Sequence, residues 1–149
     1  MKNEVVARAE AIIAKKEGTG NDGYCAVITI DENGYPMSST VSVSKADGIR
    51  WLTLGTELGS GKVSRISKCN RVCVCFNSAE YHISLVGTVE VQTDPQAKQN
   101  AWYDKLKHHF SGVDDPNYCV LRFTTERYSI FFTDGEADAG VLPKEGSND

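Results

Sequence analysis

The stretch IRWLTLGTELGSGK, residues 49–62, decides how the chain is interpreted. Its first part, Ile49 to Leu54, is rich in aromatic, β-branched and other large apolar residues, which favours a strand. Its second part, Gly55 to Lys62, is a loop of glycines and hydroxyl side chains that opens a short helix ending at Lys68. A phosphate group is bound by backbone N–H groups at a helix start, by hydroxyls and by a cation. Side chains suited to this are Thr56, Ser60 and Lys62.

The same loop has an ordinary structural explanation. It is not a P-loop, because the interval from Gly55 to Gly61 is one residue too long and Val63 follows the lysine. A helix-capping loop with Ser60 as the N-cap residue would use the same residue types. The local sequence therefore leaves two interpretations open, a phosphate site and a capping loop.

The residues before this stretch predict a helix and two more strands. Alternating and β-branched residues, separated by glycine-containing hairpin turns, form a three-stranded meander with residues 49–54. The second strand has hydroxyls on both faces from Ser38 to Ser44, which fits either a solvated edge or a strand that lines a polar ligand. The expected elements are a helix from Lys2 to Glu17 and strands from Tyr24 to Ile30 and Tyr35 to Ser44, with turns at Asp31–Gly34 and Lys45–Gly48.

The residues after this stretch predict three strands and a helix. Gly87 inside a strand indicates a bulge or a close backbone approach, and we expect a break in the last strand at Thr124–Glu126. Trp102 lies on an apolar helical stripe that either packs in the core or covers a partner subunit. The expected elements are strands from Arg71 to Asn77, Tyr81 to Gln92 and Tyr118 to Thr133, and a helix from Pro95 to about His109, capped by Asp94.

Six antiparallel strands with isolated helices predict an α+β, mainly β fold built on a small barrel. The length of 149 residues fits a single domain. We expect that domain to span residues 1–133. The tail, residues 134–149, is rich in Gly, Asp and Glu and is expected to be frayed.

Composition excludes several classes of function. The net charge is −4 and there is no concentrated basic patch, so we expect no binding to nucleic acid. No apolar run approaches the roughly 20 residues of a membrane span.

The five cysteines are odd in number and no signal peptide precedes them, which predicts reduced thiols in a cytoplasmic protein. The histidines are not spaced near the thiols, so we expect no metal site. No nucleophile, base and acid can be assembled from the spacing, so an enzyme would depend on a cofactor.

The order of these motifs resembles the pyridoxamine 5′-phosphate oxidase-like superfamily, in particular its general stress protein branch. Each motif is short, and the ordered series from residue 4 to residue 133 carries the resemblance. The matching segments are the turn and strand from Asn33 to Ser42, the phosphate segment formed by Ile49–Thr56 and Ser60–Val63, the helix and strand from Arg65 to Val74, the strand from Ser84 to Val91, and a later pattern containing Trp102, Phe110 and Asp115–Tyr118.

The resemblance implies a six-stranded antiparallel split β-barrel that forms a homodimer with two FMN sites at the interface. It also implies roles for single residues. Ser60 and Lys62 would hold the phosphate, and Trp102 would approach the flavin from the other subunit. The flavin would be lined by Ser39, Thr40, Val41 and Ser42, and Thr53, Leu54 and Thr56 would contact the flavin or its ribityl chain.

The chain departs from the family's true phosphate oxidases at three positions and at its C-terminal end. Ser39, Ser44 and Gly61 stand where those enzymes carry Arg, Lys and Arg, and the terminal R-x-H pair is missing. We therefore expect an FMN-dependent oxidoreductase-like protein of unknown substrate, with a small-molecule reductant such as NADH or NADPH, that is not a true pyridoxamine phosphate oxidase. The alternatives are a non-enzymatic flavin-binding or sensing protein in the stress response and an empty barrel that binds a partner.

Overall fold

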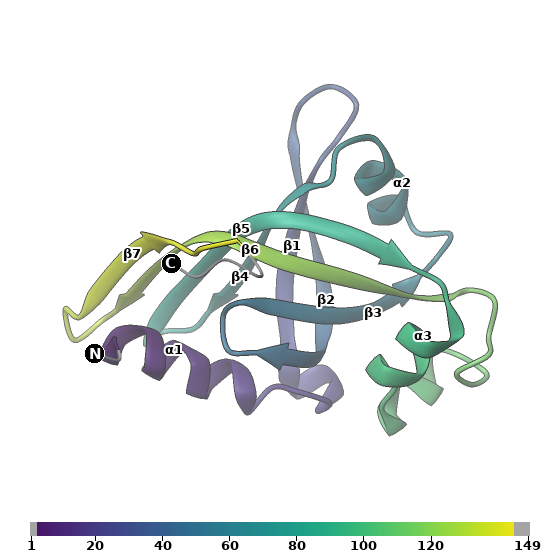
Figure 1. The fold of residues 1–149 in the computed structure, drawn as a ribbon, viewed down its shortest axis with the longest axis horizontal. Coiled ribbons are helices and arrows are strands. Elements are labelled where there is room, and N and C mark those ends of the chain that lie inside the picture. Colours follow the sequence, from purple (N-terminus) through teal and green to yellow (C-terminus); the bar gives the residue numbers. More distant parts are fainter. Residues whose placement is uncertain (1–2, 145–149) are drawn as a thin grey trace.

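Six strands with alternating buried and exposed side chains close into a barrel in the computed structural model, which describes residues 3–144 (Figure 1). Neighbouring strands are antiparallel in the order β3-β2-β1-β4-β5-β6, and pairing of β3 with β6 closes the ring. This confirms the mainly β, six-stranded antiparallel fold expected from the sequence. The strands are β1 Tyr24–Ile30, β2 Pro36–Asp47, β3 Trp51–Glu57, β4 Arg71–Asn77, β5 Tyr81–Gln92 and β6 Tyr118–Phe132.

Strand β6 has two neighbours along one edge. Its first half pairs with β3 as far as Thr124, and its second half pairs from Arg127 onward with β7, Ala137–Val141. Between the halves the register with β5 shifts at Gly87, where a Cβ would fall on the Thr124 carbonyl oxygen. The close backbone approach predicted at Gly87 is present, whereas the break expected at Thr124–Glu126 is only a bulge within a continuous strand.

The C-terminal segment differs from the frayed tail expected after Asp134. A turn with Gly135 at φ 101° leads into β7, which adds a seventh strand beside β6. The Tyr128 hydroxyl donates to the Asp138 carboxylate at 2.7 Å across this pair. An acidic, glycine-rich composition argues against a strand only when no edge is available, and the second half of β6 provides one. Residues 145–149 lie outside the described residues.

Helix α1, Glu4–Ala14, packs one face into the barrel core. It begins at Asn3, whose side chain accepts hydrogen bonds from the N–H groups of Val5 and Val6. The helix is shorter than the expected Lys2–Glu17 span, and Lys2 lies outside the described residues. Its buried residues, Val5, Ala9 and Ile13, have the spacing that predicted an amphipathic helix.

The single helix expected from Pro95 to His109 is in fact two short helices. Helix α3, Pro95–Ala101, is followed by two extended residues and then by the 3₁₀ helix η2, Asp104–His108. The bend lets side chains on both sides of it pack against Tyr118 on the outer face of β3 and β6. This second core contains Ala101, Leu106, Phe110, Tyr118 and Val120. Tertiary packing overrides the helical periodicity here.

Strand β3 extends further than the sequence predicted. Gly55 and Thr56 pair with Val120 and Cys119 on β6, so both residues belong to the sheet rather than to the loop. Strand β2 likewise continues to Asp47, with a register shift around Ser44. The true connection is therefore short and leads directly into helix α2, Gly61–Lys68.

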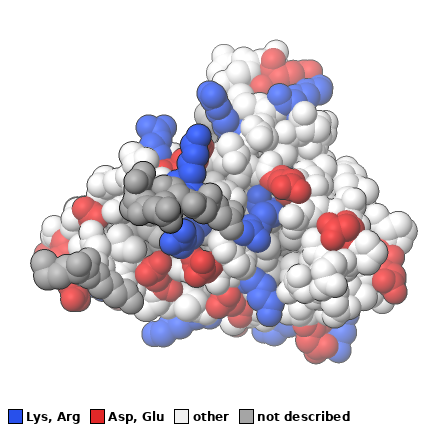
Figure 2. Space-filling view, viewed as in Figure 1, with Lys and Arg blue, Asp and Glu red and all other residues white. Residues whose placement is uncertain are grey.

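Charges are mixed over the surface. On the face drawn in Figure 2, Lys and Arg side chains are interspersed with Asp and Glu. No helix within residues 3–144 is long and apolar enough to cross a membrane.

All five cysteines are free, and burial raises the pKa of Cys25 to about 12 and that of Cys119 to about 11. Both side chains therefore remain thiols at neutral pH.

Candidate functional site

A groove of about 990 Å³ lies where β2 and β3 meet the 3₁₀ helix η1 (Gly20–Gly23), helix η2 and the start of α2. Its volume is at the upper end of the roughly 300–1,000 Å³ typical of ligand pockets. Hydroxyl, aromatic and charged side chains line it together. Strand β2 contributes Thr40, Val41 and Ser42, strand β3 contributes Gly55, Thr56 and Glu57, and the helical segments contribute Asp22, Lys62, Tyr103, Lys105 and Leu106 among others.

The groove brings together five of the residues that the sequence assigned to a flavin site. They come from three elements far apart in sequence. Because β2 and β3 are neighbours in the sheet, hydroxyls from both strands reach the same hollow. The five residues are Thr40, Val41, Ser42, Thr56 and Lys62.

The other five predicted residues lie outside the groove lining. Leu54 is fully buried in the main core and Thr53 is buried beside it in β3. Trp102 packs edge-on against Tyr118, with ring centroids 5.3 Å apart, in the second core. Ser39 and Ser60 lie close to helix α2 and are described below.

Lys62 is fixed inside the groove by β3. Its ammonium nitrogen donates a hydrogen bond to Thr56 Oγ1 at 2.9 Å. Burial lowers the pKa of Lys62, the positive charge of Arg65 acts in the same direction, and the Glu57 carboxylate opposes both. A cation that is partly desolvated beside a second cation is stabilised by an anionic ligand. This arrangement favours the binding of a phosphate.

Arg65 is a second cation close to Lys62, which sequence reasoning missed, although it does not line the groove itself. Its Nε donates to Thr29 Oγ1 at 2.6 Å and its Nη2 donates to Ser39 Oγ at 3.4 Å. A Cβ at Gly61 would lie 3.1 Å from Arg65 Nη1, so the guanidinium folds back along the first turn of α2. The only signal in the sequence was a cation one helical turn after Lys62.

Ser60 distinguishes the two interpretations of the loop. It is the N-cap residue of α2, but its side chain makes no capping hydrogen bond. Its hydroxyl is buried and has no partner among residues 3–144. A capping loop would use that hydroxyl on the N–H groups of the first helical turn. This orphaned oxygen, two residues before Lys62 in the chain, instead fits a phosphate site.

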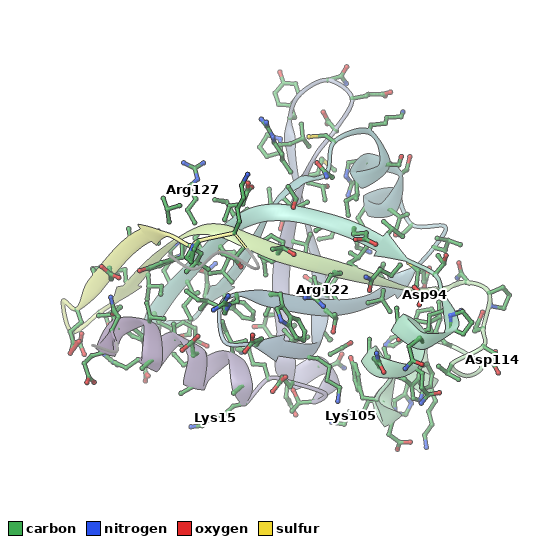
Figure 3. The ribbon with its side chains drawn as sticks, in the orientation of Figure 1. Lys15, Asp94, Lys105, Asp114, Arg122 and Arg127 are labelled. Atoms are coloured by element: carbon green, nitrogen blue, oxygen red, sulfur yellow. The ribbon has the colours of Figure 1, made fainter. Side chains whose placement is uncertain are left out.

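Tyr103 is a second residue that sequence reasoning missed. The sequence placed it beside Trp102 on one helical stripe, but only Tyr103 lines the groove. Burial raises the pKa of Tyr103, and the nearby Ser42 hydroxyl acts in the opposite direction. On the opposite rim, Lys105 Nζ donates to the Thr19 carbonyl oxygen at 2.9 Å and joins η2 to η1 (Figure 3). No glycine or proline marks the bend that separates Trp102 from Tyr103.

Comparison with known proteins places the chain in a family. The family model described as pyridoxamine 5′-phosphate oxidase matches residues 14–132. A Clostridium acetobutylicum structure, described as related to general stress protein 26, is 25% identical with a TM-score of 0.82, covering 95% of this chain and 97% of that one. General stress protein 26 from Bacillus anthracis is 21% identical with a TM-score of 0.69, covering 89% and 98%. A pyridoxamine 5′-phosphate oxidase-related FMN binding protein from Nostoc punctiforme is 13% identical with a TM-score of 0.57, covering 93% of each chain. No curated protein matches the chain.

Proposed function

Because the chain belongs to the pyridoxamine 5′-phosphate oxidase family, we propose that it is an FMN-binding oxidoreductase whose flavin occupies the groove between β2, β3 and η2. The observation that carries the proposal is the Lys62 ammonium held in the groove at the start of α2, with Arg65 beside it. The Nostoc punctiforme protein with this fold, described as binding FMN, supports the same assignment.

The donors around α2 fit the phosphate of FMN. Lys62 and Arg65 provide two positive charges for a group that carries nearly two negative ones, and Thr56 and Ser60 provide hydroxyls. The first N–H groups of α2 are unpaired within the helix, which adds donors and a favourable dipole. The hydroxyls of Thr40 and Ser42 lie further along the groove.

Once bound, FMN would supply hydride and electron transfer. The chain's own residues bind and orient. Lys62 neutralises charge, the β2 hydroxyls donate and accept hydrogen bonds, and Leu106, Tyr103 and Phe110 give the groove an apolar wall. A small reductant such as NADH or NADPH is the proposed donor.

We further propose that a second copy of the chain covers the open side of the groove. The pairing register of the strands places six small uncharged residues side by side across β2, β1, β4, β5, β6 and β7. Because each of them alternates with core residues along its own strand, its side chain points outward. The row begins at Thr40, which lines the groove. The six are Thr40, Ala26, Cys75, Ser84, Ser129 and Ala139.

Exposed hydrophobic side chains lie on the same outer face. Tyr24 is 57% exposed, Phe131 49% and Val141 79%, and each alternates in phase with that row. An uncharged row of this kind, continuous with a ligand groove and flanked by exposed hydrophobic side chains, suits a two-fold interface in which each copy closes the other's site.

Titration with FMN, FAD and riboflavin tests the cofactor. We expect FMN to bind most tightly, because riboflavin lacks the phosphate and FAD carries a bulky group on it. The readout is the change in flavin absorption and fluorescence on binding. Anaerobic addition of NADH or NADPH to the complex is then expected to bleach the flavin.

Equal affinity for riboflavin and FMN would show that the loop before α2 holds no phosphate. Tight FMN binding without bleaching by either nucleotide would indicate a flavin carrier rather than an oxidoreductase. An absence of binding by all three flavins would contradict the proposal as a whole.

A further inference from the structure

Tyr103 enters the groove because the chain bends directly before it. Helix α3 ends at Ala101, and Trp102 and Tyr103 have extended backbones, with φ and ψ of −69° and 138° and of −142° and 158°. Successive side chains of an extended segment point to opposite sides. Trp102 therefore packs edge-on against Tyr118 in the second core, whereas Tyr103, which also contacts that core, lines the groove.

The Tyr103 side chain is held on two sides. Its Cβ and Cγ lie close to the backbone of Gly18, where an added Cβ would be 3.7 and 3.8 Å away. Its hydroxyl lies close to the Ser42 side chain on β2, and both residues line the groove. Lys105 in helix η2 donates to the carbonyl of Thr19, the residue after Gly18, and so joins the same part of the chain to η2. The phenol is thus positioned before any ligand arrives, which reduces the entropy lost on binding.

The surroundings of Tyr103 suit a flat ring better than a phosphate. Leu106 and Phe110 lie in the same wall, and Tyr24 faces the groove from the start of β1. The nearby Lys105 ammonium is already engaged by a backbone carbonyl. The cations suited to a phosphate are Lys62 and Arg65 on α2.

A tyrosine hydroxyl donates one hydrogen bond and accepts others. Burial raises the pKa of Tyr103, so the phenol keeps its proton at neutral pH. The Ser42 hydroxyl can donate to the phenol oxygen, which leaves the Tyr103 O–H free to donate into the groove.

We propose that the Ser42–Tyr103 hydroxyl pair binds the flavin ring system, with Tyr103 donating to one of its carbonyl or nitrogen acceptors, while Lys62 acts on the phosphate alone. This inference rests on the proposed flavin site and divides it into a ring end and a phosphate end. Tyr103 is a binding residue in this scheme, and Ser42 positions it.

Two ligands separate the two ends. Riboflavin has the ring without the phosphate, and FMN has both. We expect Tyr103→Phe to weaken both ligands by the same factor, roughly three- to tenfold, the usual effect of one neutral hydrogen bond. We expect Lys62→Ala to weaken FMN alone. The double variant Ser42→Ala, Tyr103→Phe should lose no more flavin affinity than Tyr103→Phe alone, because the two hydroxyls act as one unit.

Tyr128→Phe is the matched control, because its hydroxyl bonds to Asp138 beside β7 and does not line the groove. It should leave both affinities unchanged. Unchanged riboflavin affinity in Tyr103→Phe would overturn the inference while leaving the flavin site intact. If the unmodified protein binds neither flavin, the proposed function fails and the inference fails with it.

Discussion

A guanidinium on α2 lies beside the position on β2 where the resemblance places an arginine in the true phosphate oxidases. That position is Ser39, and the Arg65 guanidinium donates to its hydroxyl. The expected arginine at Gly61 is likewise absent, and the Arg65 side chain folds over that glycine. A positive charge therefore lies near the start of α2, although neither Ser39 nor Gly61 supplies it. Because it comes from Arg65 instead, a residue-by-residue comparison missed it.

At the same scale, Lys62→Ala should weaken FMN binding by about 1.5–3 kcal/mol, the usual contribution of a charge-assisted hydrogen bond. That loss corresponds to roughly ten- to hundredfold in the dissociation constant. The fold should survive, because Lys62 is only partly buried and lies in the first turn of α2. Fluorescence titration with FMN measures the change.

Lys68→Ala is the matched control for this lysine. Lys68 is in the last turn of the same helix and is exposed, so its loss should leave FMN affinity unchanged. Equal losses in the two variants would mean that Lys62 contributes only to the general charge of the helix.

At the scale of elements, the sequence predicted the six barrel strands because their side chains alternate and the first two hairpin turns contain glycine. It did not predict the bend after Ala101 or strand β7. Both depend on a distant partner: the bend on Tyr118 in β6, and β7 on the free edge of the second half of β6. The same reason explains the candidate site. Thr40, Ser42 and Lys62 were found from local motifs, whereas Tyr103 required the bend.

The close contact between β5 and β6 makes Gly87→Ala a test of the barrel's construction. A Cβ there would fall on the Thr124 carbonyl oxygen and lie 2.9 Å from its carbon, so the backbone at the bulge must move. We expect a loss of about 2–3 kcal/mol in the free energy of unfolding. Urea denaturation at constant m measures it.

Gly112→Ala provides the comparison, because a Cβ there meets nothing within 4 Å and its φ is not positive. Its effect should stay within about 0.5 kcal/mol. If Gly87→Ala were equally mild, the bulge would be more adaptable than its packing indicates.

At the scale of the whole molecule, the outer sheet face predicts a homodimer. Sedimentation at micromolar concentration should show a species of twice the 16.3 kDa chain mass. Ala26→Glu places a charge in the row of small outward residues and should shift this equilibrium to the monomer. It should also weaken FMN binding, because the groove begins at Thr40, directly opposite Ala26.

Ala11→Glu, on the exposed side of α1, introduces the same charge away from that face and should leave the dimer intact. A single 16.3 kDa species for the unmodified protein would contradict the dimer and with it the shared site.

The arrangement of charges also predicts that the chain does not oxidise pyridoxamine or pyridoxine 5′-phosphate. Such a substrate brings its own phosphate, which needs cations in addition to those engaged by the flavin. Ser44 stands where the resemblance would place a lysine, and it is only 2% exposed. Near the C-terminal end Arg127 is followed by Tyr128 and Ser129, without the histidine of an R-x-H pair.

The loss of two or three charged contacts, at about 1.5–3 kcal/mol each, should weaken substrate binding by several orders of magnitude. The measurement is formation of pyridoxal phosphate by protein whose absorption spectrum shows it to be saturated with FMN. We expect no turnover above the rate of free FMN, which serves as the control. Turnover within seconds to minutes that saturates at micromolar substrate would mean that other cations of the dimer replace the missing ones. The Arg127 side chain lies on the same outer face as the row at Ser129, so Arg127→Ala would then be the first variant to examine.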